Sequence, residues 1–101
     1  ARRDKRLKRG DIRPQAELDL HGVTASEVHQ KVAWFVENAA FHGFEAVRII
    51  TGKGSHSNEG PVLRPLVEEY LSGPGRTFVV EWMRAPQKQG GEGAIVVFLR
   101  I

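Results

Sequence analysis

Residues 17–51 have the sequence ELDLHGVTASEVHQKVAWFVENAAFHGFEAVRIIT. The first six residues alternate polar and apolar side chains and end at Gly22, a pattern typical of a short strand with one buried face. Thr24–Glu27 has the spacing of a helix capping box, and apolar residues then recur at the helical period, which predicts a helix over 25–41. The nearly continuous apolar run that follows predicts a strand over 45–51 that is covered on both sides.

A strand, a helix and a second strand in this order predict a parallel pair with a right-handed crossover. Apolar residues at helical spacing predict another helix over 62–71, and β-branched and aromatic residues predict strands over 76–82 and 94–101. The polar, glycine-rich segment 84–93 between these strands is expected to be a mobile hairpin loop. We therefore predict an α/β fold: a two-layer sandwich of order βαβαββ, with a mixed, mostly parallel four-stranded sheet and both helices on one face.

The composition limits the possible classes of protein. A chain of 101 residues with 41% hydrophobic and 27% charged residues is the size and composition of one globular domain. The sequence has no cysteine, which excludes disulfide scaffolds, thiolate zinc sites and cysteine nucleophiles, and neither His29 nor His42 has the spacing of a zinc pair. Because no apolar stretch is long enough to span a bilayer, we expect no membrane association and a soluble, cytoplasmic protein.

The positive charge is concentrated at the start of the chain. The net charge is +3, yet residues 1–14 alone carry seven basic and two acidic side chains. We therefore divide the chain into a flexible basic arm, residues 1–16, and a folded domain, residues 17–101. The arm residues expected to contact nucleic-acid phosphates are Arg2, Arg3, Lys5 and Arg6. The alternative is a solubilising linker, and a chain that starts at Ala1 is also compatible with a fragment of a longer protein.

Asp19 and His21 are the first candidates for chemistry. They lie at the end of the first predicted strand, and α/β sheets bind ligands at the carboxyl ends of their parallel strands. Alternation along the strand puts the two side chains on one face, where a carboxylate can orient or polarise an imidazole that acts as acid or base. In the structural alternative, Asp19 is a local cap and His21 is a hydrogen-bonded turn residue.

The second candidate is the loop after the next strand, Gly52-Lys53-Gly54. Its glycines permit a sharp bend with exposed N–H groups, and Lys53 adds a charge suited to a phosphate or to the charge that develops during phosphodiester cleavage. Ser55 and His56 extend the loop, and His56 is a candidate for a second proton transfer. The alternatives are an ordinary turn and a solvated histidine.

Two further positions bear on the site. Arg84 is a candidate phosphate contact at the end of the third predicted strand. Val47 stands where the Walker A pattern requires glycine, which excludes a P-loop nucleotide triphosphatase.

Taken together and in order, these motifs resemble the Smr (small MutS-related) domain family over residues 17–101. The likeness consists of Leu18-Asp19-Leu20-His21-Gly22, a capped helix, Ile49-Ile50-Thr51-Gly52-Lys53-Gly54, and the loop Gly90-Gly91-Glu92-Gly93-Ala94. The resemblance implies a fold similar to the C-terminal domain of translation initiation factor three. It also implies endonuclease activity on DNA or RNA, and some members act on messenger RNA at stalled ribosomes. Stand-alone members with a basic leader occur in the family, which fits this chain.

By position, Asp19 and His21 match the family's Leu-Asp-x-His motif, and Gly52 and Gly54 match its His-Gly-x-Gly motif. Thr51 stands where many members have histidine, so a mechanism that needs a histidine there does not transfer to this chain. Either His56 replaces it, or His21 acts with Lys53 alone.

The sequence therefore predicts an endonuclease that cleaves phosphodiester bonds in RNA or nicks DNA. His21 handles the proton, Asp19 positions His21, and Lys53 with the loop N–H groups binds the phosphate. An RNA substrate, which the composition slightly favours, supplies its own 2′-hydroxyl nucleophile and requires no cofactor, whereas DNA needs attack by water and favours a divalent metal ion. The alternative is a non-catalytic module that binds nucleic acid or the ribosome. We expect a monomer.

Overall fold

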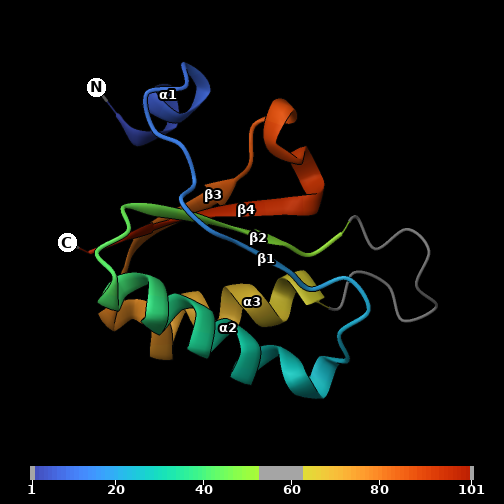
Figure 1. Cartoon of the computed structure of the whole chain (residues 1–101). Helices are drawn as coiled ribbons and strands as arrows, with labels where there is room; N and C mark the ends of the chain where they lie inside the picture. Colours follow the sequence, from blue (N-terminus) through green and yellow to red (C-terminus); the bar gives the residue numbers. More distant parts are fainter. Residues whose placement is uncertain (1, 53–62, 101) are drawn as a thin grey trace.

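The computed structural model describes residues 2–52 and 63–100, which form one sheet with helices on its faces (Figure 1). In chain order the described elements are α1 (Arg3–Lys8), β1 (Glu17–Asp19), α2 (Ala25–Phe41), β2 (Ala46–Ile50), α3 (Leu63–Ser72), the 3-10 helix η1 (Pro74–Thr77), β3 (Val79–Arg84), the 3-10 helices η2 (Gln87–Gln89) and η3 (Gly91–Gly93), and β4 (Ala94–Leu99). The predicted order βαβαββ is confirmed from β1 to β4. None of the helices in these two ranges is long and apolar enough to cross a membrane.

The four-stranded sheet has the order β1-β2-β4-β3. β1 pairs with β2 in parallel, whereas β4 lies between β2 and β3 and runs antiparallel to both. Three strands therefore point one way and β4 points the other, which confirms a mixed sheet whose last two strands form a hairpin. The register places Asp19 of β1 beside Ile50 of β2, and Ile50 beside Ala94 of β4. Arg84 of β3 pairs with Ile95 of β4. The ends of β1, β2 and β3 and the beginning of β4 consequently meet at one edge.

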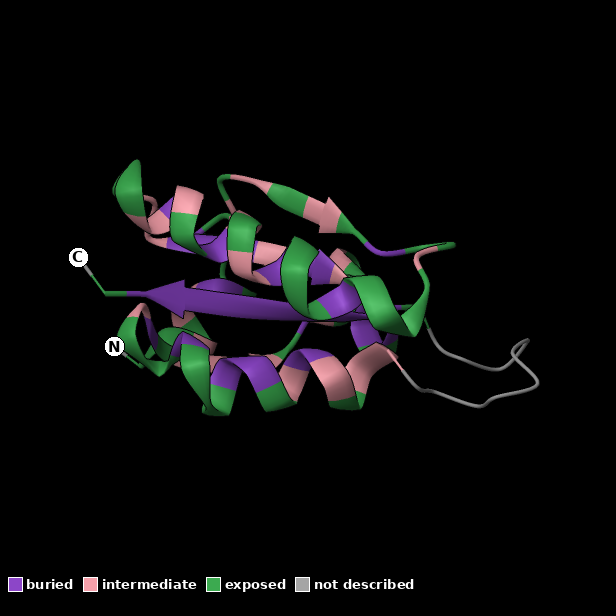
Figure 2. Cartoon of the chain, turned by 90° about the horizontal axis from the view of Figure 1, so that it is seen from below, coloured by how far each residue is buried: buried purple, intermediate pink, exposed green. Residues whose placement is uncertain are grey.

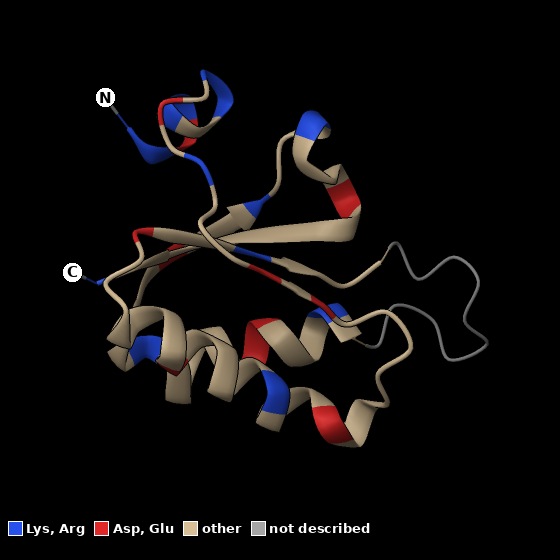
Figure 3. Ribbon diagram, in the orientation of Figure 1, with Lys and Arg blue, Asp and Glu red and all other residues tan. Residues whose placement is uncertain are grey.

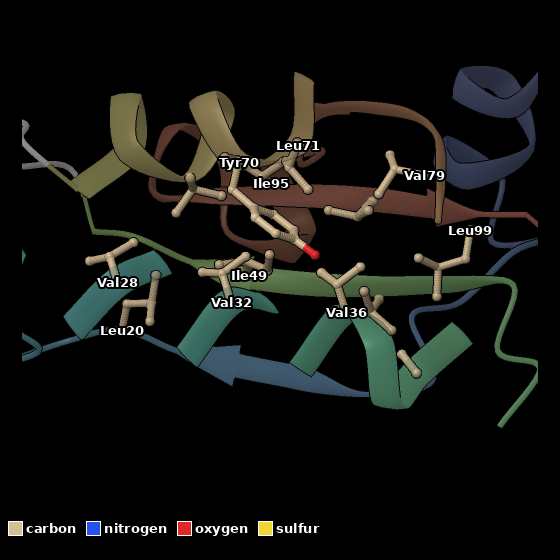
Figure 4. Close-up of a cluster of buried hydrophobic side chains, with 14 residues drawn as sticks. Leu20, Val28, Val32, Val36, Ile49, Tyr70, Leu71, Val79, Ile95 and Leu99 are labelled. Carbon is tan, nitrogen blue, oxygen red and sulfur yellow. The ribbon is translucent and has the colours of Figure 1, made fainter. Parts of the chain in front are cut away.

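The main hydrophobic core lies between the sheet and the two longer helices. Figures 1 and 2 show α2 and α3 side by side on the same face of the sheet, as the sequence predicted. Val28, Val32 and Val36 follow one another at the helical period, and all three are fully buried. They pack with Ile49 of β2 and Leu71 of α3 in the same cluster (Figure 4). Each such side chain contributes about 1.5–3 kcal/mol through burial.

α2 begins and ends where the sequence predicted, because both caps are present. The Thr24 hydroxyl donates to the Glu27 carboxylate at 2.7 Å, and the Thr24 N–H donates to the same carboxylate at 3.4 Å. These hydrogen bonds lower the pKa of Glu27. The cap is therefore complete near neutral pH and is lost as the pH falls through that lowered pKa. Gly43 ends the helix with a φ of +75°, a left-handed conformation that favours glycine.

The structure corrects the prediction of a flexible arm over residues 1–16. α1 lies on the face of the sheet that α2 and α3 leave open (Figure 1), and Leu7 and Ile12 are only 1% and 2% exposed. Their cluster includes Ala46 of β2 and three residues of β4: Ala94, Val96 and Phe98. Only Leu7 and Ile12 of this segment belong to the cluster, and two apolar residues are too few to produce a periodic signal in the sequence.

β4 is buried on both faces as a result. Its alternate residues Ile95, Val97 and Leu99 belong to the core under α2 and α3, and the residues between them belong to the cluster under α1. All six residues of the strand are buried, which explains its nearly continuous apolar sequence.

The third strand and the loop after it also differ from prediction. The predicted strand 76–82 is β3 at Val79–Arg84, because Pro74 begins the 3-10 helix η1. Gly75 of this turn packs so closely that a Cβ atom there would lie 2.6 Å from the ring of Tyr70. The segment 84–93, predicted to be a mobile loop, contains η2 and η3, and the Gly91 N–H donates to the Pro86 carbonyl at 3.1 Å.

If α1 is part of the folded domain, Leu7→Ala should lower the free energy of unfolding by about 2–5 kcal/mol, because it removes a fully buried side chain. The matched control is Lys5→Ala on the same helix, which should change stability by less than about 0.5 kcal/mol because Lys5 is exposed. Urea unfolding followed by circular dichroism measures both. Equal, small changes for the two variants would contradict a docked α1.

Candidate active site

The structure brings several predicted site residues to one edge of the sheet. Asp19 ends β1, His21 follows it, Thr51 and Gly52 follow β2, and Arg84 ends β3. β1 and β2 are neighbours, about 5 Å apart, whereas Arg84 lies three strand spacings from Asp19, or about 14 Å. The predicted meeting of the β1 and β2 ends is therefore confirmed by the strand pairing. The other loop candidates, Lys53, Gly54, Ser55 and His56, lie outside the described residues.

Asp19 holds His21 through the backbone. The Asp19 Oδ1 atom accepts a hydrogen bond from the His21 backbone N–H at 2.9 Å. This contact differs from the expected one between the carboxylate and the imidazole, and it is the local cap of the structural alternative. It fixes the chain at His21 while the exposed imidazole makes no hydrogen bond to any other described residue. The ring is therefore accessible to a ligand.

A tight turn after β1 sets the direction of the chain at His21. The Val23 N–H donates to the Leu20 carbonyl at 3.0 Å and closes the turn. Gly22 has a φ of +80°, which other residues rarely adopt. Leu20 is fully buried and anchors the start of the turn in the core. His21 thus projects from a turn that is anchored on one side by packing and on the other by the capped start of α2.

The end of β2 is tied to the η3 turn by one carbonyl group. The backbone N–H groups of Thr51 and Gly52 donate to the Gly93 carbonyl at 2.9 and 3.0 Å. The Thr51 hydroxyl donates to the carbonyl of Gly52 at 3.2 Å, and this side chain is 7% exposed. Gly52 has a φ of +78°, which explains the glycine at this position. Its N–H group is already bonded, so Gly52 does not offer the free amide that we expected to bind a phosphate.

Two arginines lie at the same edge, each beside a carboxylate: Arg64 is paired with Glu68 and Arg84 with Glu92. Arg64, in the first turn of α3, donates to the Glu92 carbonyl at 3.0 Å. Arg84 lies 3.7 Å from the Glu92 carboxylate, so η3 is held between the two arginines. Sequence reasoning singled out Arg84 but missed Arg64, because helical periodicity does not reveal which turn a polar helix residue will contact.

The arm residues predicted to bind phosphate do not reach this edge. Figure 3 shows basic residues gathered on α1. Arg3 pairs with Glu81 of β3 at 3.1 Å, and Arg6 pairs with Glu45 just before β2 at 3.8 Å. Glu45 precedes β2 and Glu81 lies in the first half of β3, so both partners lie away from the edge where these strands end. Lys5 is exposed, and Arg2 lies 3.6 Å from Asp4 of the same helix.

Within the described part of the chain, no three His, Cys, Asp or Glu residues gather as a metal-binding group.

Comparison with known proteins identifies relatives of this arrangement. The family model described as Smr domain matches residues 18–100. The structure of YdaL, a stand-alone small MutS-related protein from Escherichia coli, is similar with a TM-score of 0.81 and 30% identity, covering 96% of this chain and 73% of that one. Endonuclease MutS2 of Carboxydothermus hydrogenoformans is 38% identical over 83% of this chain, and ribosome rescue factor SmrB of Haemophilus influenzae is 30% identical over 94%. The chain spans only 10% of that MutS2 and 53% of that SmrB.

The contact between Asp19 and His21 can be tested by amide hydrogen exchange. Asp19→Ala removes the acceptor, so the His21 amide should exchange about fivefold faster, which corresponds to a hydrogen bond of about 1 kcal/mol. Asp19→Asn keeps an acceptor oxygen and should exchange within about twofold of the unchanged protein. NMR measures both rates, and equal exchange in all three proteins would show that the carboxylate does not hold the chain at His21.

Proposed function

This chain belongs to the Smr domain family, and on that premise we propose that it is an endonuclease that cleaves phosphodiester bonds at the edge where β1 and β2 end. The observation that carries the proposal is the exposed imidazole of His21, whose backbone is fixed by Asp19 beside the end of β2. The name of the MutS2 relative, an endonuclease, supports the class of reaction. The names of the SmrB relatives, ribosome rescue factors, support RNA at the ribosome as a substrate and hence a cytoplasmic location.

On an RNA strand, His21 would act as the general base. It takes the proton of the 2′-hydroxyl, whose oxygen attacks the adjacent phosphorus. The bond from phosphorus to the 5′-oxygen breaks, and that oxygen receives a proton from His21 in its protonated form or from water. The products are a 2′,3′-cyclic phosphate and a 5′-hydroxyl. This route requires no cofactor.

The remaining groups would bind and position the phosphate. Asp19 is a positioning residue, because it acts on the His21 backbone rather than on the reacting atoms. Lys53, which lies outside the described residues, would supply positive charge next to Gly52. Arg64 extends the positive charge of the edge from the side of α3, where its guanidinium is held by the Glu92 carbonyl.

With DNA as the substrate, the nucleophile would be water, because there is no 2′-hydroxyl. A divalent ion that activates this water would then be expected to contribute. At this edge the Asp19 carboxylate already accepts the His21 N–H, and the Glu92 carboxylate is paired with Arg84. We therefore propose RNA as the preferred substrate.

The second candidate function is a module that binds nucleic acid or the ribosome without cutting. Two observations favour it. Thr51, where the resemblance leads one to expect histidine, has its hydroxyl bonded to backbone carbonyls, and the Gly52 N–H is bonded to Gly93. The edge then has fewer groups free for catalysis. Formation of a product separates the two functions.

Replacement of the histidine tests the assignment. His21→Ala should reduce RNA cleavage at saturating substrate at least about 100-fold, the lower end of a general acid–base contribution, while binding stays within a few-fold. The matched control is His29→Ala, which removes an exposed histidine from α2 and should leave cleavage within about twofold. A denaturing gel of labelled single-stranded RNA measures the rates. Undiminished cleavage by His21→Ala would reject His21 as the acid or base.

A further inference from the structure

A groove lies on the face of the sheet opposite α2 and α3, between the end of α1, the start of β1 and the η2 turn. Its volume is about 610 Å³. Five of its lining side chains are basic and one, Glu17, is acidic; the basic ones are Lys8, Arg9, Arg13, Arg48 and Lys88. Because five cations face a single carboxylate, the lining favours an anionic ligand.

Arg48 is fixed at the floor of the groove, where its charge is paired with that of Glu17. It lies two residues from both Ala46 and Ile50 on β2, so its side chain is on the same face as theirs, the face under α1. Its guanidinium donates to the Glu17 carboxylate of β1 and, at 2.9 Å, to the Gln89 carbonyl of η2. Arg48 thus links β1, β2 and the η2 turn, and a rigid guanidinium suits phosphate recognition.

Much of the remaining positive charge is not neutralised locally. Lys8, Arg13 and Lys88 are exposed, and none has a carboxylate of a described residue within salt-bridge distance. Arg9 pairs with Asp11 at 3.1 Å. The first part of the arm differs, because Arg3 and Arg6 are paired with acidic residues of the domain. The positive charge of residues 1–16 that is available to a ligand therefore lies mainly at Lys8 and Arg13, beside the groove.

The groove leads to the candidate active site. Glu17 lines it, and Asp19 follows two residues later on the same face of β1, about 7 Å further along the strand. Lys88 and Gln89 line its other side, and the turn that contains them continues directly into η3, whose Gly93 holds the end of β2. The groove therefore lies on the same face of β1 as Asp19, two residues before His21.

We propose that this groove binds the phosphate backbone of a single RNA or DNA strand and directs it to Asp19 and His21. That the strand is directed to His21 rests on the proposed function. That the groove binds a strand at all rests on the charge of the groove itself. Several spaced cations suit a phosphate polymer, because each phosphate contact releases condensed counterions. Arg13 and Lys88, on opposite walls, would contact phosphates directly, while Arg48 would hold the walls together.

The test is salt-dependent binding by the double variant Arg13→Gln/Lys88→Gln. Fluorescence anisotropy with labelled single-stranded RNA and single-stranded DNA measures Kd between 0.05 and 0.3 M salt, about the range in which such contacts dominate. Loss of two phosphate contacts should reduce the slope of log K against log salt by about 1.4 and raise Kd about twentyfold at 0.1 M salt. The matched control is Lys31→Gln/Arg76→Gln, which removes the same charge from exposed positions on α2 and η1.

The control should change the slope by less than about 0.3, because its side chains contact no phosphate. Thermal unfolding of both double variants confirms that they fold. Equal effects of the two double variants, or no effect of the first, would overturn the groove as the binding site, and so would an unchanged protein that binds neither probe.

The same samples are run on a denaturing gel, so that binding and cleavage are read separately. A selective loss of binding with no product from the unchanged protein supports the groove and rejects the proposed cleavage. Product without any difference in binding between the two double variants rejects the groove and supports cleavage. A difference between the RNA and DNA probes identifies which backbone the groove prefers.

Discussion

The parallel pairing of β1 with β2 is the constraint on which the candidate site depends. A parallel pair needs a crossover, and α2 provides it by burying its valine stripe against the sheet. Because both strands run the same way, their carboxyl ends meet, and the register brings Asp19 beside Ile50. His21 and Thr51, each next in the chain after these strand ends, are thereby brought to the same edge. A register shift would put the Asp19 side chain on the other face of the sheet.

The Gly93 carbonyl, in the turn before β4, fixes the residues that follow β2 at the same edge. By accepting both the Thr51 and the Gly52 N–H groups, it joins the end of β2 to the turn that precedes β4. Arg64 and Arg84 then bind Glu92 in the same turn, so α3 and β3 are linked to it as well. The groove depends on the same part of the chain, because Arg48 holds η2 to the sheet. The binding of a strand and the chemistry at His21 would therefore use one connected framework.

The sequence predicted those parts of the fold whose signals are periodic or local. α2 has a stripe of valines, a capping box and Gly43, and both of its ends were predicted correctly. The segment with α1 has only Leu7 and, after the helix, Ile12 as buried apolar residues, which make no repeating pattern, so its contact with the sheet was missed. η1 begins at Pro74 and displaces the start of β3, and its Gly75 packs against the ring of Tyr70. The contact between Leu7 and β4 joins segments far apart in the chain and leaves no mark in a local stretch of sequence.

The site was predicted in position but not in its contacts. Alternation along the strand predicted a contact between the Asp19 and His21 side chains, whereas the Asp19 carboxylate accepts its hydrogen bond from the His21 backbone. Likewise, a glycine at position 52 indicated a bend, and only the structure reveals that its amide is bonded to Gly93. Arg48 was hidden in an apolar strand, where its pairing with Glu17 depends on the register. The sequence therefore shows which charged residues are present near a site, but it does not show which residues they bind.

We propose that the edge at His21 cleaves RNA through the 2′-hydroxyl. Mass spectrometry of the fragments formed from a single-stranded RNA, with and without a chelator, tests it most directly. We expect fragments that end in a 2′,3′-cyclic phosphate and begin with a 5′-hydroxyl, in equal yield under both conditions. Absence of fragments, or fragments that begin with a 5′-phosphate and form only without the chelator, would contradict it.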